Sequence, residues 1–361
     1  MSSLIGKRKL LAIEPYFGGS HRLFLETLAE KAGFSVDILS LPAHSWKWRM
    51  RFAAPFFAAT LPAAARYDCV LCSSMLDVAA LRGMGPAWLK STRLVTYFHE
   101  NQFVYPVRKT DPRDLHFAVT NLTTAIASDR VLFNSDYNRR SFLAGAEELL
   151  VKLPDMQAGI DLSKLMAKSS VLAPPMDFGS LDAVLSGSGR TRGEAPLLIW
   201  NHRWEHDKNP DLFFECLFCL QKTGKPFRVA VLGQSFRDVP KIFEKAHQLL
   251  GGKIVHFGFA PRQTYVQWLH AGTIVLSTAL HEFFGISVIE AVRAGCRPLL
   301  PARLSYPELF DGDFLYENEE VVPALELALA EGRLHKEQAV SLTERFSSGR
   351  LLPDYEAVFF G

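Results

Sequence analysis

Long apolar runs are absent from this sequence. No stretch reaches the roughly 20 apolar residues that a bilayer-spanning helix needs, so the sequence predicts no transmembrane segment. Near the start, Lys7 and Arg8 lead directly into the short run 9–14, which is too brief for the apolar core of a signal peptide and is typical of a first strand. We therefore expect a cytoplasmic protein.

Cysteine is scarce, and its pattern argues against two kinds of site. Five cysteines, an odd number without a secretory signal, do not form a disulfide framework. Cys69 and Cys72 lie in a strand-like run, where residues three apart point to opposite faces. Cys216 and Cys219 lie inside an apolar helical run, with no turn that would bring both thiolates to one zinc ion. No Asp-x-Asp stands at a predicted strand end, so we expect no metal and an activity that EDTA leaves unchanged.

A strong charge of either sign is also lacking. The formal net charge is +2, which is too small to make the whole molecule a polyelectrolyte binder. Cations exceed anions in the first half of the chain and anions exceed cations in the second. The basic first half could meet an anionic partner such as RNA, although many unrelated domains share this bias.

What is present is the alternation of an α/β protein. With 361 residues, 48% of them hydrophobic, the chain exceeds a usual single core and predicts two domains. Short apolar runs alternate with helix-like stretches in both halves, which indicates βαβ units and parallel sheets. The predicted strands are 10–14, 35–39, 69–73, 93–97, 130–133, 197–200, 227–233, 254–257, 274–278 and 297–300.

Pro, Gly and Ser gather between the two halves, as in a linker. The sequence therefore predicts a Rossmann-like domain at 1–173, a linker at 174–196, a second Rossmann-like domain at 197–335, and a C-terminal helix at 336–361 that packs back toward the first domain. Two Rossmann-like domains facing a central cleft are the expected architecture.

The most informative segment is 281–290, which follows a predicted strand. Glu282 and Glu290 stand eight residues apart, and Gly285 between them permits a tight transition from loop to helix. Both carboxylates could then reach one ligand above the carboxyl ends of the strands. Carboxylates accept hydrogen bonds from paired hydroxyls of a sugar or ribose, while helix amides suit a diphosphate. Phe283 and Phe284 belong to the same loop.

Two cations follow the first strand of the second half. Arg203 and Lys208 are placed to face a diphosphate, whose negative charge grows as a glycosidic bond breaks. A charged turn before a helix is the alternative.

Other strand ends carry weaker signals. Gly18 and Gly19 allow backbone amides to approach a phosphate or sugar, although the pattern is not that of a nicotinamide dehydrogenase. His99 ends another strand and is the candidate next to the donor sugar, with Glu100 or Asn101 as alternatives.

The Glu-x7-Glu pattern resembles that of retaining GT-B glycosyltransferases of the glycogen-synthase-like and family 4 type. The resemblance implies that Glu282 holds the transferred sugar and that Glu290 holds the nucleotide ribose. It places a catalytic Arg and Lys at Arg203 and Lys208, a histidine at His99, and base recognition by the backbone near Gly258 and Phe259. Retention of anomeric configuration and independence of metal follow from the same family.

Five segments together are similar to the tRNA-queuosine mannosyltransferase family: 14–21, 41–49, 98–106, 202–208 and 281–285. This similarity implies an acceptor domain at 1–173, a donor-nucleotide domain at 197–335, and transfer of mannose from GDP-mannose to the cyclopentenediol of queuosine in the anticodon of aspartate tRNA. The residues expected to bind the acceptor or RNA are His21, Trp46, Lys47, Trp48, Arg49, Arg51, Asn101 and Gln102.

The residues themselves permit that acceptor without requiring it. Aromatic and basic side chains interleave from Trp46 to Arg51, and no acidic residue occurs from Leu41 to Tyr67. Such a patch can stack on unpaired bases and contact phosphates; equally, the tryptophans could be core and the cations a solvated rim.

Three alternatives stay open at this point. One is a family 4-like enzyme with another sugar-nucleotide donor and a non-RNA acceptor, and another is a nucleotide-sugar epimerase or hydrolase on the same fold. The third is a catalytically silent RNA-binding protein on the GT-B scaffold.

Overall fold

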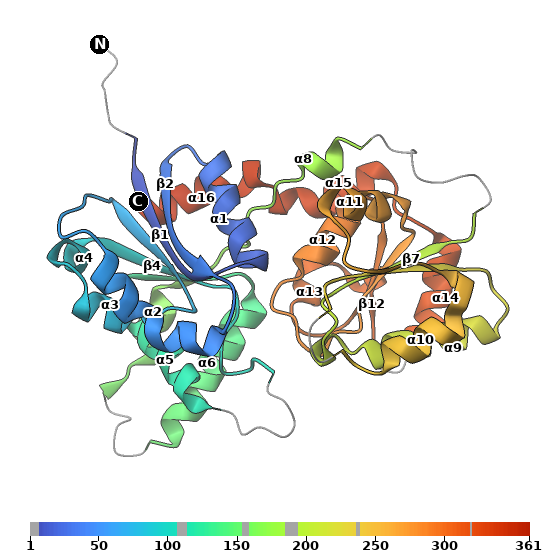
Figure 1. The fold of residues 1–361 in the computed structure, drawn as a ribbon, viewed down its shortest axis with the longest axis horizontal. Helices are drawn as coiled ribbons and strands as arrows, with labels where there is room; N and C mark the ends of the chain where they lie inside the picture. Colours follow the sequence, from blue (N-terminus) through green and yellow to red (C-terminus); the bar gives the residue numbers. More distant parts are fainter. Residues whose placement is uncertain (1–6, 107–113, 154–158, 185–193, 236–238, 318–319) are drawn as a thin grey trace, which may run out of the picture. The chain divides into compact units, whose positions relative to one another are not determined.

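The computed structural model describes residues 7–106, 114–153, 159–184, 194–235, 239–317 and 320–361. The chain forms two compact units: unit 1 comprises Met1–Met176 and Phe346–Gly361, and unit 2 comprises Asp177–Arg345. In Figure 1 each unit is a sheet flanked by helices.

Within the described residues, unit 1 holds a six-stranded parallel sheet of order β2-β1-β3-β4-β5-β6. The strands are β1 (Lys9–Phe17), β2 (Ser35–Pro42), β3 (Cys69–Ser73), β4 (Arg93–Phe98), β5 (Arg130–Phe133) and β6 (Ser169–Val171). The helices are α1 (Gly19–Lys31), α2 (Trp46–Thr60), α3 (Val78–Met84), α4 (Ala87–Ser91), α5 (Leu115–Ala127), α6 (Asp136–Val151), α7 (Leu162–Ala167) and α16 (Ser348–Phe360).

The described part of unit 2 holds a second six-stranded parallel sheet, of order β12-β11-β10-β7-β8-β9. The strands are β7 (Leu197–Asn201), β8 (Arg228–Leu232), β9 (Ile254–Gly258), β10 (Ile274–Leu276), β11 (Arg297–Pro301) and β12 (Leu315–Tyr316). The α-helices are α8 (Gly179–Asp182), α9 (Pro210–Lys222), α10 (Ile242–Leu250), α11 (Arg262–Ala271), α12 (Ile286–Arg293), α13 (Tyr306–Leu309), α14 (Val321–Glu331) and α15 (Lys336–Thr343). Short 3-10 turns are η2 (His206–Lys208), η3 (Gly251–Lys253), η4 (Gly312–Phe314) and η6 (Glu344–Phe346).

The central strands are buried on both faces, because helices cover both sides of each sheet. Every residue of β3 and of β7 is buried. This burial explains why these strands read in the sequence as continuous apolar runs rather than as alternating ones. Cys69 and Cys72 point to opposite faces of the sheet and pack into two different core clusters. Burial raises the pKa of the Cys69 thiol to about 12, so a thiolate is disfavoured there.

The C-terminal stretch differs from the expected single helix. α15 packs on α12 in unit 2, whereas α16 returns to unit 1 and lies beside α1 (Figure 1). Tyr355 of α16 is fully buried, and its hydroxyl donates to the carbonyls of Leu172 and Ala173 at 3.3 and 2.9 Å. Residues from both ends of the chain therefore build unit 1.

The expected linker is partly structured. Its helix α8 buries Leu181, and Asp182 pairs with Arg293 of α12 at 2.7 Å. Met176 belongs to unit 1, where it donates a backbone hydrogen bond to Phe346. The predicted linker residues 185–193 lie outside the described residues.

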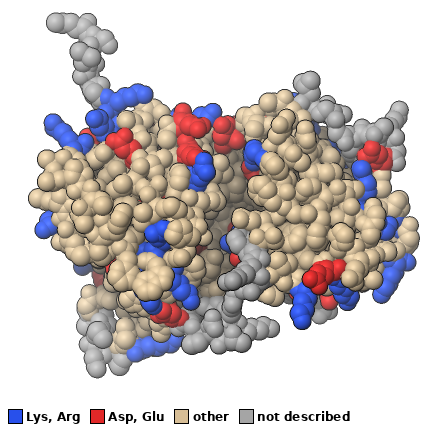
Figure 2. Space-filling view, viewed as in Figure 1, with Lys and Arg blue, Asp and Glu red and all other residues tan. Residues whose placement is uncertain are grey.

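The molecular surface carries no broad field of one charge on the face drawn in Figure 2, where Lys and Arg are mixed with Asp and Glu. Among the described residues, no helix combines the length and apolar character that a membrane span requires.

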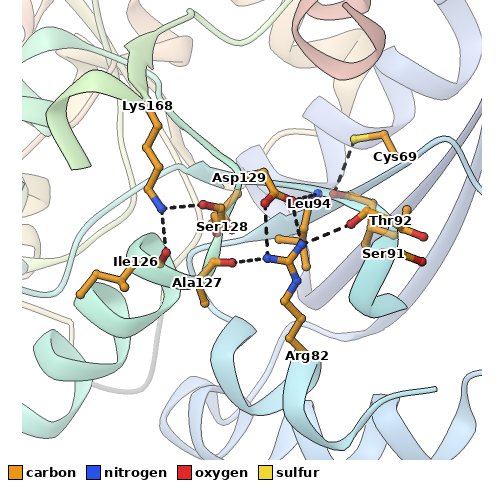
Figure 3. A network of polar contacts seen from close by, with 12 residues as sticks. Cys69, Arg82, Ser91, Thr92, Leu94, Ile126, Ala127, Ser128, Asp129 and Lys168 are labelled. Atoms are coloured by element: carbon orange, nitrogen blue, oxygen red, sulfur yellow. Dashed lines mark hydrogen bonds and ion pairs between the residues drawn. The ribbon is translucent and has the colours of Figure 1, made fainter. Parts of the chain in front are cut away.

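Arg82 of α3 ties together the edge of unit 1 where β4 and β5 begin (Figure 3). Its guanidinium donates to the carbonyl of Ala127 at 2.7 Å and of Thr92 at 3.3 Å, and it pairs with Asp129 at 2.8 Å. The same carboxylate accepts the backbone N–H of Leu94 at 2.7 Å. One side chain thus joins α3, α5 and the starts of two strands.

We expect Arg82→Ala to lower the free energy of unfolding by about 1–3 kcal/mol, because it leaves two carbonyls and a half-buried carboxylate without their shared donor. Urea titration would measure the loss. Arg22→Ala is the matched control: Arg22 forms an exposed pair with Glu26 on α1, and its loss should cost less than about 0.5 kcal/mol. Equal stabilities for the two variants would contradict the assigned role of Arg82.

Candidate active site

Gly285 forms the transition from the loop after β10 to α12. Its φ of +110° lies in the left-handed region that favours glycine, and it precedes the first residue of α12. Because the loop turns sharply there, Glu282 projects from the loop while Glu290 lies on the helix. The local structure is therefore the one that the spacing predicted.

Lys208 and Glu282 form a buried ion pair. The Lys208 Nζ lies 3.3 Å from a Glu282 carboxylate oxygen and 3.2 Å from one of Asp207, and it donates to the carbonyl of His281 at 2.6 Å. Burial opposes the charge on both partners, but their mutual attraction outweighs it: the pKa of Glu282 falls to about 2 and that of Lys208 rises. Both groups are therefore ionised at neutral pH.

Backbone and hydroxyl contacts hold the two loops of this pair together. The carbonyl of Asp207 accepts the N–H groups of Leu280 and His281, and the Thr278 hydroxyl donates to the carbonyl of Lys208. Lys208, 74 positions before Glu282 in the sequence, is fixed beside it by these bonds. The arrangement is preorganised, as an electrostatic site requires.

Arg203 lies in the same electrostatic neighbourhood, since its charge disfavours protonation of Lys208 and of His202. Its half-exposed guanidinium pairs with Glu205 at 3.1 Å. Among the described residues, no hydrogen-bond partner exists for two buried atoms nearby, Nε2 of His202 and Oδ1 of Asn201. Burial lowers the pKa of His202 to about 4, so it presents a neutral ring. Unpartnered buried polar atoms at a strand end are expected where a polar ligand binds.

Glu290 belongs to a second set of contacts that the sequence did not reveal. Arg262 and Tyr265 of α11 both bond its carboxylate, the tyrosine hydroxyl at 3.1 Å, and Asn201 donates to that hydroxyl at 3.1 Å. Arg262 and Tyr265 stand three residues apart, a spacing that places them on one helix face. That spacing is the signal that could have identified them, but it is common in helices.

The remaining donor-side predictions lie as follows. Gly258 ends β9 with a φ of +129° and Phe259 is 70% exposed beside it. Phe283 and Phe284 are buried, and the Phe283 ring packs edge-on against His281. The side chains of these two phenylalanines therefore shape the loop, while their backbone stays beside Glu282 and Gly285.

In unit 1, His21 lies between two carboxylates. Its Nδ1 is 2.9 Å from Glu14 and its Nε2 is 3.2 Å from Glu100. Burial opposes protonation of this ring, but the two carboxylates outweigh it and raise the pKa of His21 to about 10. Ser73 and Ser74 donate to the outer oxygens of Glu14 and Glu100. The result is a charged cluster at the carboxyl ends of β1, β3 and β4.

His99 stacks on this imidazolium, with ring centroids 4.1 Å apart. Burial and the charge of His21 both lower the pKa of His99 well below its usual value. The two histidines therefore differ in charge at neutral pH although their rings touch. Glu14 was missed in the sequence because it is a single carboxylate inside an apolar strand, and only the fold brings it to His21.

Asn101 and Gln102 are buried, and the side-chain amide of Asn101 forms hydrogen bonds within unit 1. Its nitrogen donates to the side chains of Asn138 and Ser141, and its oxygen accepts the N–H of Phe103. The structure thus gives Asn101 the task of holding the turn after His99. Gln102 donates its backbone N–H to Asn121 at 2.8 Å.

Gly18 and Gly19, at the start of α1, are each required to be glycine for a different reason. A Cβ on Gly18 would lie 2.5 Å from that of Ala43, and Gly19 has a φ of +53°. The aromatic and basic segment lies on α2: Trp46 packs on Phe117 with centroids 5.0 Å apart, whereas Trp48 is 63% exposed. Trp46 is therefore half-buried against the core and Trp48 lies on the surface, so the interpretation that made both tryptophans core is wrong for Trp48.

Known proteins share this fold and parts of this sequence. Solved structures of similar fold include Anabaena Alr3699/HepE in complex with UDP, with a TM-score of 0.67 and 13% identity over 97% of this chain and 98% of that one. A Thermosynechococcus elongatus sucrose-phosphate synthase matches with a TM-score of 0.69 and 13% identity over 98% of both chains. The model of the family described as "Glycosyl transferases group 1" matches residues 186–324. The fold is GT-B, and the chain is a glycosyltransferase.

The N-terminal half defines the family more narrowly. Residues 9–176 match the model "tRNA-queuosine alpha-mannosyltransferase N-terminal". A tRNA-queuosine alpha-mannosyltransferase of Drosophila melanogaster is 36% identical over 98% of this chain and 97% of its own. The chain belongs to the tRNA-queuosine alpha-mannosyltransferase family, as the five segments predicted.

Proposed function

We propose that this protein transfers mannose from GDP-mannose to the cyclopentenediol of queuosine in the anticodon of aspartate tRNA, with retention of configuration and without a metal. The acceptor is proposed from the near full-length similarity to the Drosophila tRNA-queuosine alpha-mannosyltransferase. The chemistry of the donor is supported by the buried pair of Lys208 and Glu282 beside Arg203. A cytoplasmic location, where tRNA is available, belongs to the same proposal.

The donor roles follow from charge and hydrogen-bonding capacity. Lys208 and Arg203 supply positive charge to the departing diphosphate, and Glu282 accepts hydrogen bonds from the sugar hydroxyls. Glu290 accepts from the ribose hydroxyls, for which Arg262 or Tyr265 must yield one carboxylate position. Backbone groups near Gly258, Phe259 and Gly285 contact the base and diphosphate, as the sequence predicted.

Transfer is a front-face displacement. The bond from the anomeric carbon to the phosphate oxygen breaks, and its electron pair leaves with the GDP. An acceptor hydroxyl oxygen bonds to the same carbon from the same face, and its proton passes to the departing phosphate oxygen. His99, neutral at pH 7, orients the transferring sugar. His21 and Glu100 contact the acceptor diol, for which the bond between them must yield its place.

The test is transfer of radiolabelled mannose from GDP-mannose to purified tRNA with and without queuosine, beside UDP-glucose and UDP-GlcNAc. We expect label only from GDP-mannose and only on queuosine-containing tRNA, and equal label with EDTA. Label on tRNA that lacks queuosine would contradict the acceptor. Release of free sugar from GDP-mannose, with no label on any tRNA, would instead identify a hydrolase, and strong inhibition by EDTA would contradict the metal-free mechanism.

A further inference from the structure

Helix α2 turns large aromatic side chains toward solvent. Trp48, Phe52 and Phe56 are 63%, 58% and 47% exposed, and their spacing of four residues places them in one row. The opposite side of the helix is buried through Met50, Ala53, Ala54 and Phe57. Large exposed aromatics in a continuous row are unusual on a surface that contacts only water.

A row of cations runs beside the aromatic row. Lys47 and Arg51 precede Trp48 and Phe52 by one residue each, and both are exposed. The Lys47 Nζ lies 5.8 Å from the Trp46 ring centre, and the Arg51 guanidinium lies 4.9 Å from that of Phe117. These contacts are with rings outside the aromatic row, and it is their positions on the helix, one residue before Trp48 and Phe52, that place the two cations beside it. No acidic residue occurs from 41 to 67. Among the described residues, Asp114 pairs with Arg51 at 2.7 Å.

Given the proposed function, on which this inference rests, we infer that the aromatic row of α2 is the docking surface for unpaired nucleotides of the tRNA loop that carries the acceptor. Unpaired bases stack on aromatic faces whatever their sequence, and neighbouring cations contact the phosphates that join them. The row from Trp48 to Phe56 extends about 12 Å along the helix, room for several stacked bases. Phe52 and Phe56 extend the surface beyond the aromatic and basic segment seen in the sequence, and Trp46, which packs inward, is not part of it.

Charge and composition favour RNA over the other occupants of such a face. A second copy docked about a two-fold axis would bring the cations of both helices into one interface, where α2 offers no carboxylate to pair with them. A helix that lies on a lipid surface keeps the side opposite its apolar face charged and in water, whereas the side of α2 opposite the aromatic row is packed in the core. Phosphate charge complements the cation row directly.

The test compares the wild-type chain with the triple variant Trp48→Ala, Phe52→Ala and Phe56→Ala in filter binding to queuosine-containing tRNA. We expect affinity to fall roughly 10- to 100-fold and the KM for tRNA to rise, since each lost stack weakens binding. The melting temperature and the thermal shift caused by GDP-mannose should stay at wild-type values. Met84→Ala, an equally exposed apolar position on α3, is the matched control and should bind tRNA normally.

A second variant separates stacking from loss of fold. Trp48→Phe keeps an aromatic face and should retain most of the affinity that Trp48→Ala loses. Wild-type affinity in the triple variant, with transfer to tRNA intact in the parent, would overturn the docking surface and leave the proposed function standing. Absence of tRNA binding and transfer in the parent would overturn both. Loss of binding to phosphatidylserine vesicles, or of a dimer mass, at unchanged tRNA affinity would assign the row to lipid or to a second copy and so overturn the inference.

Discussion

Glu282→Ala is expected to abolish mannose transfer while leaving the fold intact. The variant removes the carboxylate proposed to hold the transferred sugar. It also removes one of the two carboxylates paired with Lys208. Removal of one preorganised polar group in an active site typically costs about 100- to 1000-fold in kcat, and we expect a loss of at least that size. Asp207 stays paired with Lys208, so the buried cation keeps a counter-charge.

The measurement is single-turnover transfer beside a melting curve. Glu215→Ala is the matched control, because Glu215 is an exposed glutamate on α9 of the same unit and should behave as wild type. A fully active, normally folded Glu282 variant would sink the assignment of the donor site. A variant that fails to melt cooperatively would be replaced by Glu282→Gln, which keeps the side-chain volume and removes only the charge.

The second large effect is a pH dependence of stability that originates at His21. The two carboxylates raise the pKa of His21 from 6.5 to about 10, so the folded protein binds this proton more tightly than the unfolded chain does. The resulting stabilisation is fully present below pH 6.5 and is lost as the pH rises through about 10. Over that window it amounts to about 5 kcal/mol.

Urea titrations of wild type and His21→Gln from pH 6 to pH 10 would measure this contribution as the pH-dependent part of the difference between the two proteins, since groups remote from His21 affect both alike. We expect the difference in free energy of unfolding to be largest at pH 6 and to shrink steadily toward pH 10. His44→Gln, at an exposed histidine in the same unit, should show no such trend. A difference that stays constant with pH would mean that His21 is not held charged between Glu14 and Glu100.

The sequence predicted the strands well where burial is complete and poorly where an element is short. The run 69–73 was predicted correctly as a strand, β3. All five of its residues are buried, and a strand buried on both faces is recognised as a continuous apolar run without alternation of polar and apolar residues. β6 and β12 were not predicted, because strands of three and two residues are too short to show a hydrophobic periodicity. The stretch 336–361 looked like one helix, yet it divides between two units because α15 and α16 bury their apolar faces against different helices.

The candidate site shows the same limit at the level of single side chains. Gly285 between Glu282 and Glu290 is a local pattern, and it gave the loop-to-helix transition correctly. The pattern could not reveal that Arg262 of α11 bonds Glu290, since a contact between neighbouring helices depends on how both pack on the sheet. Nor could it show which tryptophan of α2 is exposed, because that depends on the contact between Trp46 and Phe117 of α5.

By itself the sequence determined the α/β alternation and the loop-to-helix transition at Gly285 that places Glu282 and Glu290, because each depends on neighbours within about ten residues. Only the tertiary structure decided that Lys208 lies against Glu282 and that His21 lies between Glu14 and Glu100. Lys208 and Glu282 are 74 positions apart, and His21 and Glu100 are 79 apart. Glu14 is only 7 positions from His21, but it lies on β1 while His21 lies on α1, so their contact depends on how the helix packs on the sheet. The order and parallel register of the strands bring such residues to one edge of a sheet, and side-chain periodicity carries no record of that order.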